Sequence, residues 1–266
     1  MQLLEKLFGL NGMTALITGA GSGLGQVIAE GYAQAGARVI CADIAKDRLG
    51  EVVENIRSAG GKADPCQVDV WNEDSVAAAA AGLGDSHLDV LVNFAGVASA
   101  PTLTHELSTE DWNRGVGISL TGTFLMTRAM LPKMRSKGGS IINVASILGL
   151  GGYFPGFPAS SADYAAAKAG VIGFTRQVAV EYAAEAVRAN VIAPGWHSGT
   201  RLGAERRAKR TAEEEERFYS EMHRRIPMQR RGDASEILGL ALYLASPASG
   251  YLTGQVITQD GGWTAC

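Results

Sequence analysis

The sequence lacks the features of a cystine-stapled, metal-binding or membrane-spanning protein. Its cysteines are odd in number and scattered, at Cys41, Cys66 and Cys266. This excludes a disulfide framework, and the histidines form no metal-ligand spacing with one another or with cysteine. No apolar run approaches the ~20 residues of a membrane span. Glu5 and Lys6 interrupt the N-terminal apolar residues, so no signal peptide is expected there and a reducing cytoplasm is the predicted location.

Neither positive nor negative charge is present in large excess. The net charge is -3 and charged residues make up 19% of the chain, which excludes nucleic-acid binding by the whole molecule on electrostatic grounds. Hydrophobic residues make up 46%, as in soluble globular proteins. We find no linker, repeat or low-complexity tract in the 266 residues, so residues 1–266 are expected to form a single domain.

Short apolar runs alternate with longer segments of helical spacing. Helical patterns at 24–36 and 45–60 each follow an apolar run directly. This order predicts an α/β fold with a doubly wound parallel sheet and helices on both faces. Residues 196–231 are long, charged and poor in apolar pattern, and are predicted to leave the core and form one or two helices. The expected strands are 13–19, 37–43, 66–70, 88–96, 139–146, 187–194 and 254–260.

Glycine, by contrast, is abundant and clustered. The segment "TGAGSGLG" (18–25) follows the first strand and opens the first helix, where glycines let the backbone approach a pyrophosphate at the helix N-terminus. Asp43 ends the next strand, where a carboxylate accepts hydrogen bonds from an adenosine ribose. The plainer alternative is a structural turn and a chance acid. Because Asp43 would repel a 2′-phosphate, and neither Ser22 nor Ile44 is a compensating cation, the pattern favours NAD over NADP.

A second motif, "YAAAK" (164–168), places Tyr164 and Lys168 one helical turn apart. A free tyrosine has a pKa near ~10. A cation within ~4–6 Å favours the phenolate, so Lys168 could lower the pKa of Tyr164 with help from the nicotinamide charge and partial burial. Tyr164 would then act as a general acid and base. On an exposed helix the same spacing would mean nothing, but after a nucleotide-binding turn it indicates catalysis.

Five segments occur in order: "TGAGSGLG", "NFAG" (93–96), "YAAAK", "APG" (193–195) and "YLTGQVITQDGG" (251–262). Together they resemble the short-chain dehydrogenase/reductase family from about Gly12 to Gly262. The resemblance implies a single Rossmann-type domain with a seven-stranded parallel sheet. It also implies hydride transfer between a nicotinamide and an alcohol or carbonyl, in a homotetramer or homodimer.

The resemblance also assigns roles to single residues. Ser146 would orient the reacting oxygen, Tyr164 would exchange its proton, and Lys168 would assist Tyr164 and hold the nicotinamide ribose. The cofactor would be bound by these two residues and by Gly19, Ser22, Gly23, Leu24, Gly25, Asp43, Asp69, Val70, Asn93, Ala95, Gly96, Pro194, Gly195, His197 and Thr200.

The chain departs from the family pattern at the position of an asparagine that serves in a water-linked proton relay. Ser119 stands there. Either Ser119 or its backbone carbonyl still holds the water, which makes Ser119 a fourth catalytic candidate, or the enzyme is weakened or specialised.

Two further departures concern the substrate side. The gap from Ser146 to Tyr164 is longer than usual, and Tyr153, Phe154 and Phe157 in it would either wall the substrate pocket or anchor the loop. His197 stands where relatives carry an aliphatic residue, and would touch the substrate or lie on the surface. In relatives the region at 196–231 is a substrate lid; its basic run could meet an anionic substrate, or pair with the following glutamates along a solvated helix.

The sequence therefore predicts an NAD-dependent dehydrogenase that interconverts a secondary alcohol and a ketone. The expected substrate is small and polar: a polyol, a sugar or a hydroxy acid. The N-terminal segment resembles gluconate-type dehydrogenases weakly. The alternatives are a beta-ketoacyl thioester reductase that uses NADPH, which Asp43 speaks against, and a cofactor-binding protein with weak catalysis, which Ser119 suggests.

Overall fold

The core of the molecule is one parallel sheet. The computed structural model describes residues 2–152, 161–200 and 211–265. Seven strands pair in the order β3-β2-β1-β4-β5-β6-β7, and every pair is parallel. This confirms the predicted seven-stranded sheet. The strands are β1 (Thr14–Thr18), β2 (Arg38–Asp43), β3 (Lys62–Gln67), β4 (Val90–Asn93), β5 (Gly139–Val144), β6 (Val187–Pro194) and β7 (Val256–Gln259).

Strand β3 differs most from its predicted position at 66–70. Val68 and Val70, which suggested a buried strand, follow the last paired residue and pack into the core instead. The paired segment is an edge strand in which only Ala63 is buried. Pro65 is tolerated there because an edge strand can spare one N–H group.

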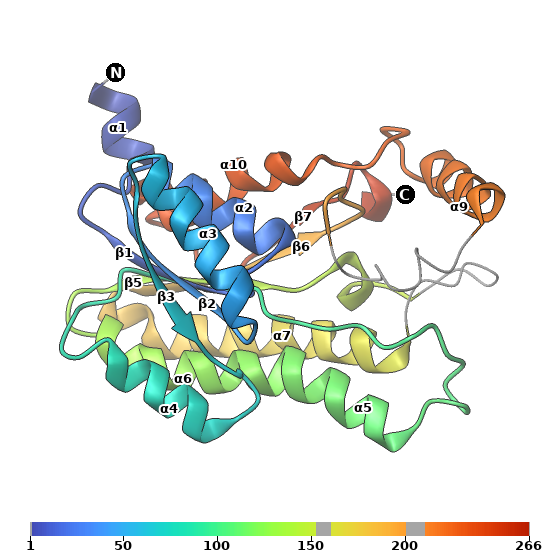
Figure 1. Cartoon of the computed structure of the whole chain (residues 1–266), viewed down its shortest axis with the longest axis horizontal. Helices are drawn as coiled ribbons and strands as arrows, with labels where there is room; N and C mark the ends of the chain where they lie inside the picture. Colours follow the sequence, from blue (N-terminus) through green and yellow to red (C-terminus); the bar gives the residue numbers. More distant parts are fainter. Residues whose placement is uncertain (1, 153–160, 201–210, 266) are drawn as a thin grey trace.

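Helices cover both faces of the sheet (Figure 1). On one face α2, α3 and α10 pack over an apolar cluster that includes Ile28 and Val53, and on the other α4, α6 and α7 pack over a second cluster that includes Met126 and Val178. The α-helices are α1 (Gln2–Phe8), α2 (Gly23–Gln34), α3 (Lys46–Ser58), α4 (Glu73–Gly82), α5 (Thr109–Val116), α6 (Gly122–Met134), α7 (Ala162–Tyr182), α9 (Ala212–Arg225) and α10 (Ile237–Ala245).

The strand order reverses between β1 and β4. The chain runs outward from β1 through β2 to β3, then restarts at β4 on the other side of β1. A crevice opens at the carboxyl ends of the strands at such a point. The Thr18 hydroxyl fixes its floor, because it accepts hydrogen bonds from the backbone N–H groups of Phe94 (3.0 Å) and Ala95 (3.1 Å). The loops after β1 and β4 are thereby held side by side.

Within the region at 196–231, helix α9 lies away from the sheet at one end of the molecule (Figure 1). The basic run at 201–210 and the aromatic residues Tyr153, Phe154 and Phe157 lie outside the described residues. Within the described ranges, no helix is both long and apolar enough to span a bilayer, and no cluster of three or more His, Cys, Asp or Glu residues could hold a metal ion.

Candidate active site

A cavity of ≈ 620 Å³ lies at the carboxyl ends of the strands. Most of the residues expected at the site lie in its wall, although they are far apart in the sequence. They are Gly19, Ser22, Gly23, Leu24, Asp43, Asp69, Val70, Ala95, Gly96, Ser146, Tyr164, Lys168, Pro194, Gly195, His197 and Thr200. Gly25, Asn93 and Ser119 lie outside this wall.

The glycine turn has the backbone geometry that its sequence predicts. Gly19 and Gly23 have φ of 70° and 60°, which other residues adopt at a cost. A Cβ on Gly25 would lie 2.3 Å from the carbonyl oxygen of Gly19, so Gly25 packs the turn against α2 rather than facing the cavity. Ser22 begins α2 with a hydroxyl that makes no capping bond. A helix N-terminus lined by glycines can bind a phosphate through its N–H groups.

Asp43 joins this turn to the end of β2. Its carboxylate accepts hydrogen bonds from the N–H groups of Gly21 (3.1 Å) and Ala45 (2.9 Å). A Cβ on Gly21 would lie 2.9 Å from that carboxylate, so the turn closes over the acid only with glycine there. The cavity wall thus places a hydrogen-bond acceptor, the Asp43 carboxylate, beside a glycine turn that can bind phosphate. This arrangement fits a dinucleotide.

The structure places a cation beside Asp43 at a position that the sequence analysis did not consider. Arg48, in the first turn of α3, lies 3.6 Å from the Asp43 carboxylate and lines the cavity, and its Nε is buried without a partner among the described residues. Sequence reasoning considered only the residues beside Asp43 and Ser22. The helical pattern at 45–60 could have revealed Arg48, since it places this side chain in the turn that follows β2.

Ser146, Tyr164 and Lys168 meet in the cavity as the motifs predict. Ser146 follows β5, and its hydroxyl accepts a hydrogen bond from Leu148 N (3.2 Å). A Cβ on Gly149 would lie 2.6 Å from the carbonyl carbon of Lys168, so this turn packs directly on α7. The Lys168 ammonium lies 5.6 Å from the centre of the Tyr164 ring and donates a hydrogen bond to the Val144 carbonyl (2.7 Å).

Burial controls the pKa values of this group. It raises the pKa of Tyr164 to about 12, against a smaller lowering by a hydrogen bond with Ser146. Burial also lowers the pKa of Lys168 to about 8. In the protein alone the pKa of Tyr164 therefore lies above its ordinary value, because desolvation of the phenolate outweighs the hydrogen bond with Ser146. The lowering of this pKa by Lys168 with help from the nicotinamide charge stays a prediction.

Asn93 lies beneath the cavity rather than in it. Its amide nitrogen donates hydrogen bonds to Thr127 (3.0 Å) and to Asn143 (2.8 Å), and Asn143 donates in turn to Thr175 (2.9 Å). These buried polar groups join α6, β4, β5 and α7 below the site. Asn93 therefore helps to position the strand ends that carry the cavity, and its contact with a cofactor stays a prediction.

Ser119 occupies a π-helical turn between α5 and α6 and is fully buried. Its hydroxyl contacts both backbone polar groups of Val97, at 3.3 Å each. The Ser119 hydroxyl and the Lys168 ammonium both lie 3.3 Å from the position that a Cβ on Gly96 would occupy. Ser119 is thus near Lys168, as the resemblance implies, but its hydroxyl is already engaged by the backbone.

His197 is buried in the cavity wall. Its Nδ1 lies 3.4 Å from the Gly195 carbonyl, and a Cβ on Gly232 would lie 2.8 Å from its ring. Burial lowers the pKa of His197, so the ring is neutral at neutral pH. Between the two expectations for His197, the structure favours a wall residue over a surface residue.

Asp163 was missed by sequence reasoning. It directly precedes Tyr164, is fully buried, and its carboxylate accepts hydrogen bonds from the hydroxyls of Ser99 (2.7 Å) and Ser161. A Cβ on Gly115 would lie 2.0 Å from this carboxylate, so α5 makes room for it. A negative charge in the first turn of a helix is also stabilised by the helix dipole. Asp163 therefore anchors the start of α7, which carries Tyr164.

Comparison with known proteins agrees with this geometry. A family model described as enoyl-(acyl carrier protein) reductase matches residues 19–264. The chain is 40% identical over 256 residues to cis-4-hydroxycyclohexanecarboxylate dehydrogenase of Sinomonas cyclohexanicum, covering 94% of this chain and 96% of the relative. It is 37% identical over 256 residues to a 3-oxoacyl-[acyl-carrier-protein] reductase of Thermotoga maritima, covering 95% and 98%.

Solved structures include close neighbours. A putative NAD(P)-dependent gluconate 5-dehydrogenase from Beutenbergia cavernae, with bound NADP at low occupancy, superposes with a TM-score of 0.88 at 35% identity over 97% of this chain and 99% of that one. The resemblance to gluconate-type dehydrogenases is thereby confirmed. With the ordered motifs, the sheet and these relatives in agreement, the chain belongs to the short-chain dehydrogenase/reductase family and is an oxidoreductase that binds a nicotinamide cofactor.

Proposed function

We propose that the protein is an NAD(H)-dependent oxidoreductase that interconverts a secondary alcohol and a ketone. One observation carries the proposal: Ser146, Tyr164 and Lys168 lie in the wall of the same cavity as Asp43 and the glycine turn. A proton-exchanging group and a nucleotide-binding end thus share one enclosed space. Such a combination is what hydride transfer coupled to proton transfer requires.

In oxidation, Tyr164 takes the proton from the substrate hydroxyl, while the Ser146 hydroxyl donates a hydrogen bond to the same oxygen. In reduction, the neutral Tyr164 returns that proton to the carbonyl oxygen. A bound nicotinamide dinucleotide supplies the two-electron acceptor or donor. Lys168, held at the Val144 carbonyl, brings positive charge near the phenol and stabilises its anion. A Cβ on Gly195 would lie 2.7 Å from Asp260, so this position needs glycine, and Gly195 lines the cavity through its backbone.

The proposed substrate is a small polar alcohol: a polyol, a sugar or a hydroxy acid. The names of two relatives support a hydroxy acid, because one acts on cis-4-hydroxycyclohexanecarboxylate and another is described as a gluconate 5-dehydrogenase. Neither name decides the substrate of this chain.

NAD is proposed as the cofactor because the Asp43 carboxylate would repel a 2′-phosphate and would accept a hydrogen bond from a free 2′-hydroxyl. Arg48 opposes this preference, since a guanidinium beside Asp43 could pair with a 2′-phosphate. We expect the carboxylate to prevail, because two backbone N–H groups fix its position in the cavity wall and Arg48 is already engaged by it.

A beta-ketoacyl thioester reductase that uses NADPH is the second candidate. Arg48 and the name of the Thermotoga maritima relative favour it. A cofactor-binding protein with weak catalysis is the third candidate, favoured by the engagement of the Ser119 hydroxyl with Val97, which leaves that hydroxyl poorly placed to hold a relay water.

A substrate panel separates the three candidates. Gluconate, sorbitol and cis-4-hydroxycyclohexanecarboxylate are offered with NAD or NADP, and acetoacetyl thioester with NADH or NADPH, while absorbance of the reduced nicotinamide is followed. The first proposal predicts turnover of at least one alcohol with NAD. Turnover of only the thioester with NADPH supports the second candidate, and cofactor binding without any turnover supports the third.

We also propose that the protein is a homodimer or homotetramer. Apolar side chains are exposed on two adjacent helices, Phe124 on α6 and Val180 on α7, where a second copy could cover them. Phe124 packs edge-on against Phe174 of α7, with ring centres 6.1 Å apart, so the aromatic side chains of the two helices are in contact.

A further inference from the structure

One side of the cavity is built from aromatic and aliphatic side chains. Trp196, Phe218, Tyr219 and Met222, which we call the aromatic wall, all line it. Trp196 lies edge-on to Phe218, with ring centres 6.3 Å apart, and Phe218 to Tyr219, at 5.6 Å. Such a surface gains free energy by covering hydrocarbon and little by covering hydroxyl groups.

The described residues hold the aromatic wall in place. Helix α9 begins at a capping box in which the Thr211 hydroxyl accepts from Glu214 N (3.2 Å) and the Glu214 carboxylate accepts from Thr211 N (2.9 Å). Its last turn is fixed by Met222 and Ile226, both almost fully buried. The wall is therefore formed before any substrate arrives, which lowers the entropic cost of binding.

A cation lies at the aromatic wall. The Arg231 guanidinium is 4.2 Å from the centre of the Tyr219 ring and lines the cavity. The backbone of the next residue, Gly232, is held by two hydrogen bonds. Gly232 N donates to the Trp196 carbonyl and Ser198 N donates to the Gly232 carbonyl, each at 2.9 Å.

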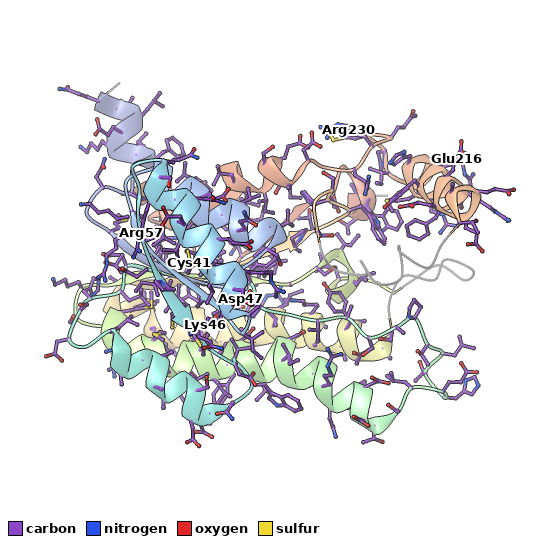
Figure 2. All side chains as sticks on the ribbon, in the orientation of Figure 1. Cys41, Lys46, Asp47, Arg57, Glu216 and Arg230 are labelled. Carbon is purple, nitrogen blue, oxygen red and sulfur yellow. The ribbon has the colours of Figure 1, made fainter. Side chains whose placement is uncertain are left out.

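Arg231 differs from its neighbour in its partners. Arg230, on the segment between α9 and α10 (Figure 2), forms two hydrogen bonds with the Glu236 carboxylate, at 2.7 and 2.8 Å, and does not line the cavity. Among the described residues, no carboxylate pairs with Arg231. An arginine is charged at neutral pH, and its fork of N–H groups matches a carboxylate. The cavity thus holds a preformed anion receptor beside an apolar surface.

We propose that the substrate is a hydroxy acid whose hydrocarbon body, a ring or short chain, separates the reacting hydroxyl from the carboxylate. The body packs on the aromatic wall, the carboxylate pairs with Arg231, and the hydroxyl reaches Tyr164. This inference rests on the proposed function and narrows its substrate class. Oxidation would break the C–H and O–H bonds of the carbinol: bound NAD⁺ would supply the acceptor for the hydride, the Tyr164 phenolate would take the proton, and a keto acid would result.

A matched pair of alcohols tests the carboxylate. We compare 4-(1-hydroxyethyl)benzoate with 4-(1-hydroxyethyl)benzamide, which keeps the ring and the secondary alcohol but removes the charge. Wild type is expected to favour the benzoate by about 10–100-fold in kcat/KM, the worth of a hydrogen-bonded charge. Arg231→Gln should abolish this preference through KM with little change for the benzamide, and Arg231→Lys should restore part of it.

Controls keep the inference separate from the proposed function. Arg230→Gln should leave the preference unchanged, because Arg230 faces Glu236. The carboxylate assignment is overturned if wild type uses both alcohols equally, or if the preference for the benzoate survives in Arg231→Gln. Neither result contradicts the proposed dehydrogenase activity. If the enzyme oxidises sorbitol or gluconate but neither of the two aromatic alcohols, the proposed substrate class is overturned and the dehydrogenase activity is not. No turnover of any of these alcohols, with NADH still bound, overturns the proposed function itself.

Discussion

At the residue scale, Asp43 and Arg48 favour different cofactors: the carboxylate favours the free 2′-hydroxyl of NAD, and the guanidinium favours the 2′-phosphate of NADP. We predict that wild type prefers NAD over NADP by about tenfold or more in kcat/KM, which corresponds to ~1.4 kcal/mol. Asp43→Ala should narrow or reverse the preference, because it removes the ribose acceptor and frees the guanidinium, now 3.6 Å from the carboxylate, for a 2′-phosphate.

Kinetics with both cofactors measure this preference, with Arg48→Gln in the Asp43→Ala background as the control. That second change should lower use of NADP again. A wild-type preference for NADP refutes the cofactor assignment.

The pH dependence of the two reaction directions follows from the phenol. With burial raising the pKa of Tyr164 to about 12, the phenol of the protein alone is neutral at pH 7. Oxidation needs Tyr164 able to accept a proton, so its rate should rise with pH, by up to tenfold per unit below the controlling pKa. Reduction needs the neutral phenol and should be flat there, and fall above that pKa. Initial rates from pH 6 to 9 in both directions measure this, and oxidation that is flat or falls over the range contradicts the assignment.

At the element scale, the contact between α5 and α7 depends on Gly115. Alanine is ordinarily favoured over glycine in a helix by ~1 kcal/mol. At this position, however, its Cβ would lie 2.0 Å from the buried Asp163 carboxylate. We predict that Gly115→Ala lowers the free energy of unfolding by about 1–3 kcal/mol, as overpacking does, and lowers kcat because Asp163 adjoins Tyr164.

Gly50→Ala is the matched control for this prediction. Gly50 lies on α3 with nothing within 4 Å of its Cβ position, so this change should stabilise the protein slightly. Urea unfolding of both variants decides the matter, since equal effects of the two substitutions would show that the contact with Asp163 has no energetic weight.

The elements also show what the sequence could and could not predict. Strand β6 is predicted to the residue, because all its residues except Arg188 are buried and most of them are apolar. Strand β3 pairs earlier in the chain than the predicted 66–70. Few side chains of this edge strand are buried, so the apolar residues mark the place after it where the chain returns to the core.

The same contrast holds at the site. The spacing of Tyr164 and Lys168 predicts their proximity, since one helix carries both. Arg231 meets Tyr219 only through the pairing of Gly232 with Trp196 and Ser198, and Asp163 fits only because Gly115 lies on another helix. Such contacts depend on tertiary packing, which no local pattern encodes.

At the scale of the whole molecule, we predict a homodimer or homotetramer in solution. Phe124 is 40% exposed and Val180 79% exposed, on helices that pack side by side. Phe124→Glu should shift the mass measured by light scattering toward a smaller species, because a buried charge without a partner is costly at an interface. Leu103→Glu changes an exposed leucine outside these helices, more exposed than Phe124, and should leave the mass unchanged. A monomeric wild type contradicts this prediction.

The function of the whole molecule depends on one proton transfer, and Tyr164→Phe tests it most directly. Phenylalanine keeps the ring in its buried site and removes only the hydroxyl, so the fold and the glycine turn should be undisturbed. Turnover of the best substrate and binding of NADH, followed by fluorescence, are measured on the same preparation. The account predicts that turnover falls by about 10²–10⁴-fold while NADH affinity is retained. Activity within a few-fold of wild type would contradict it.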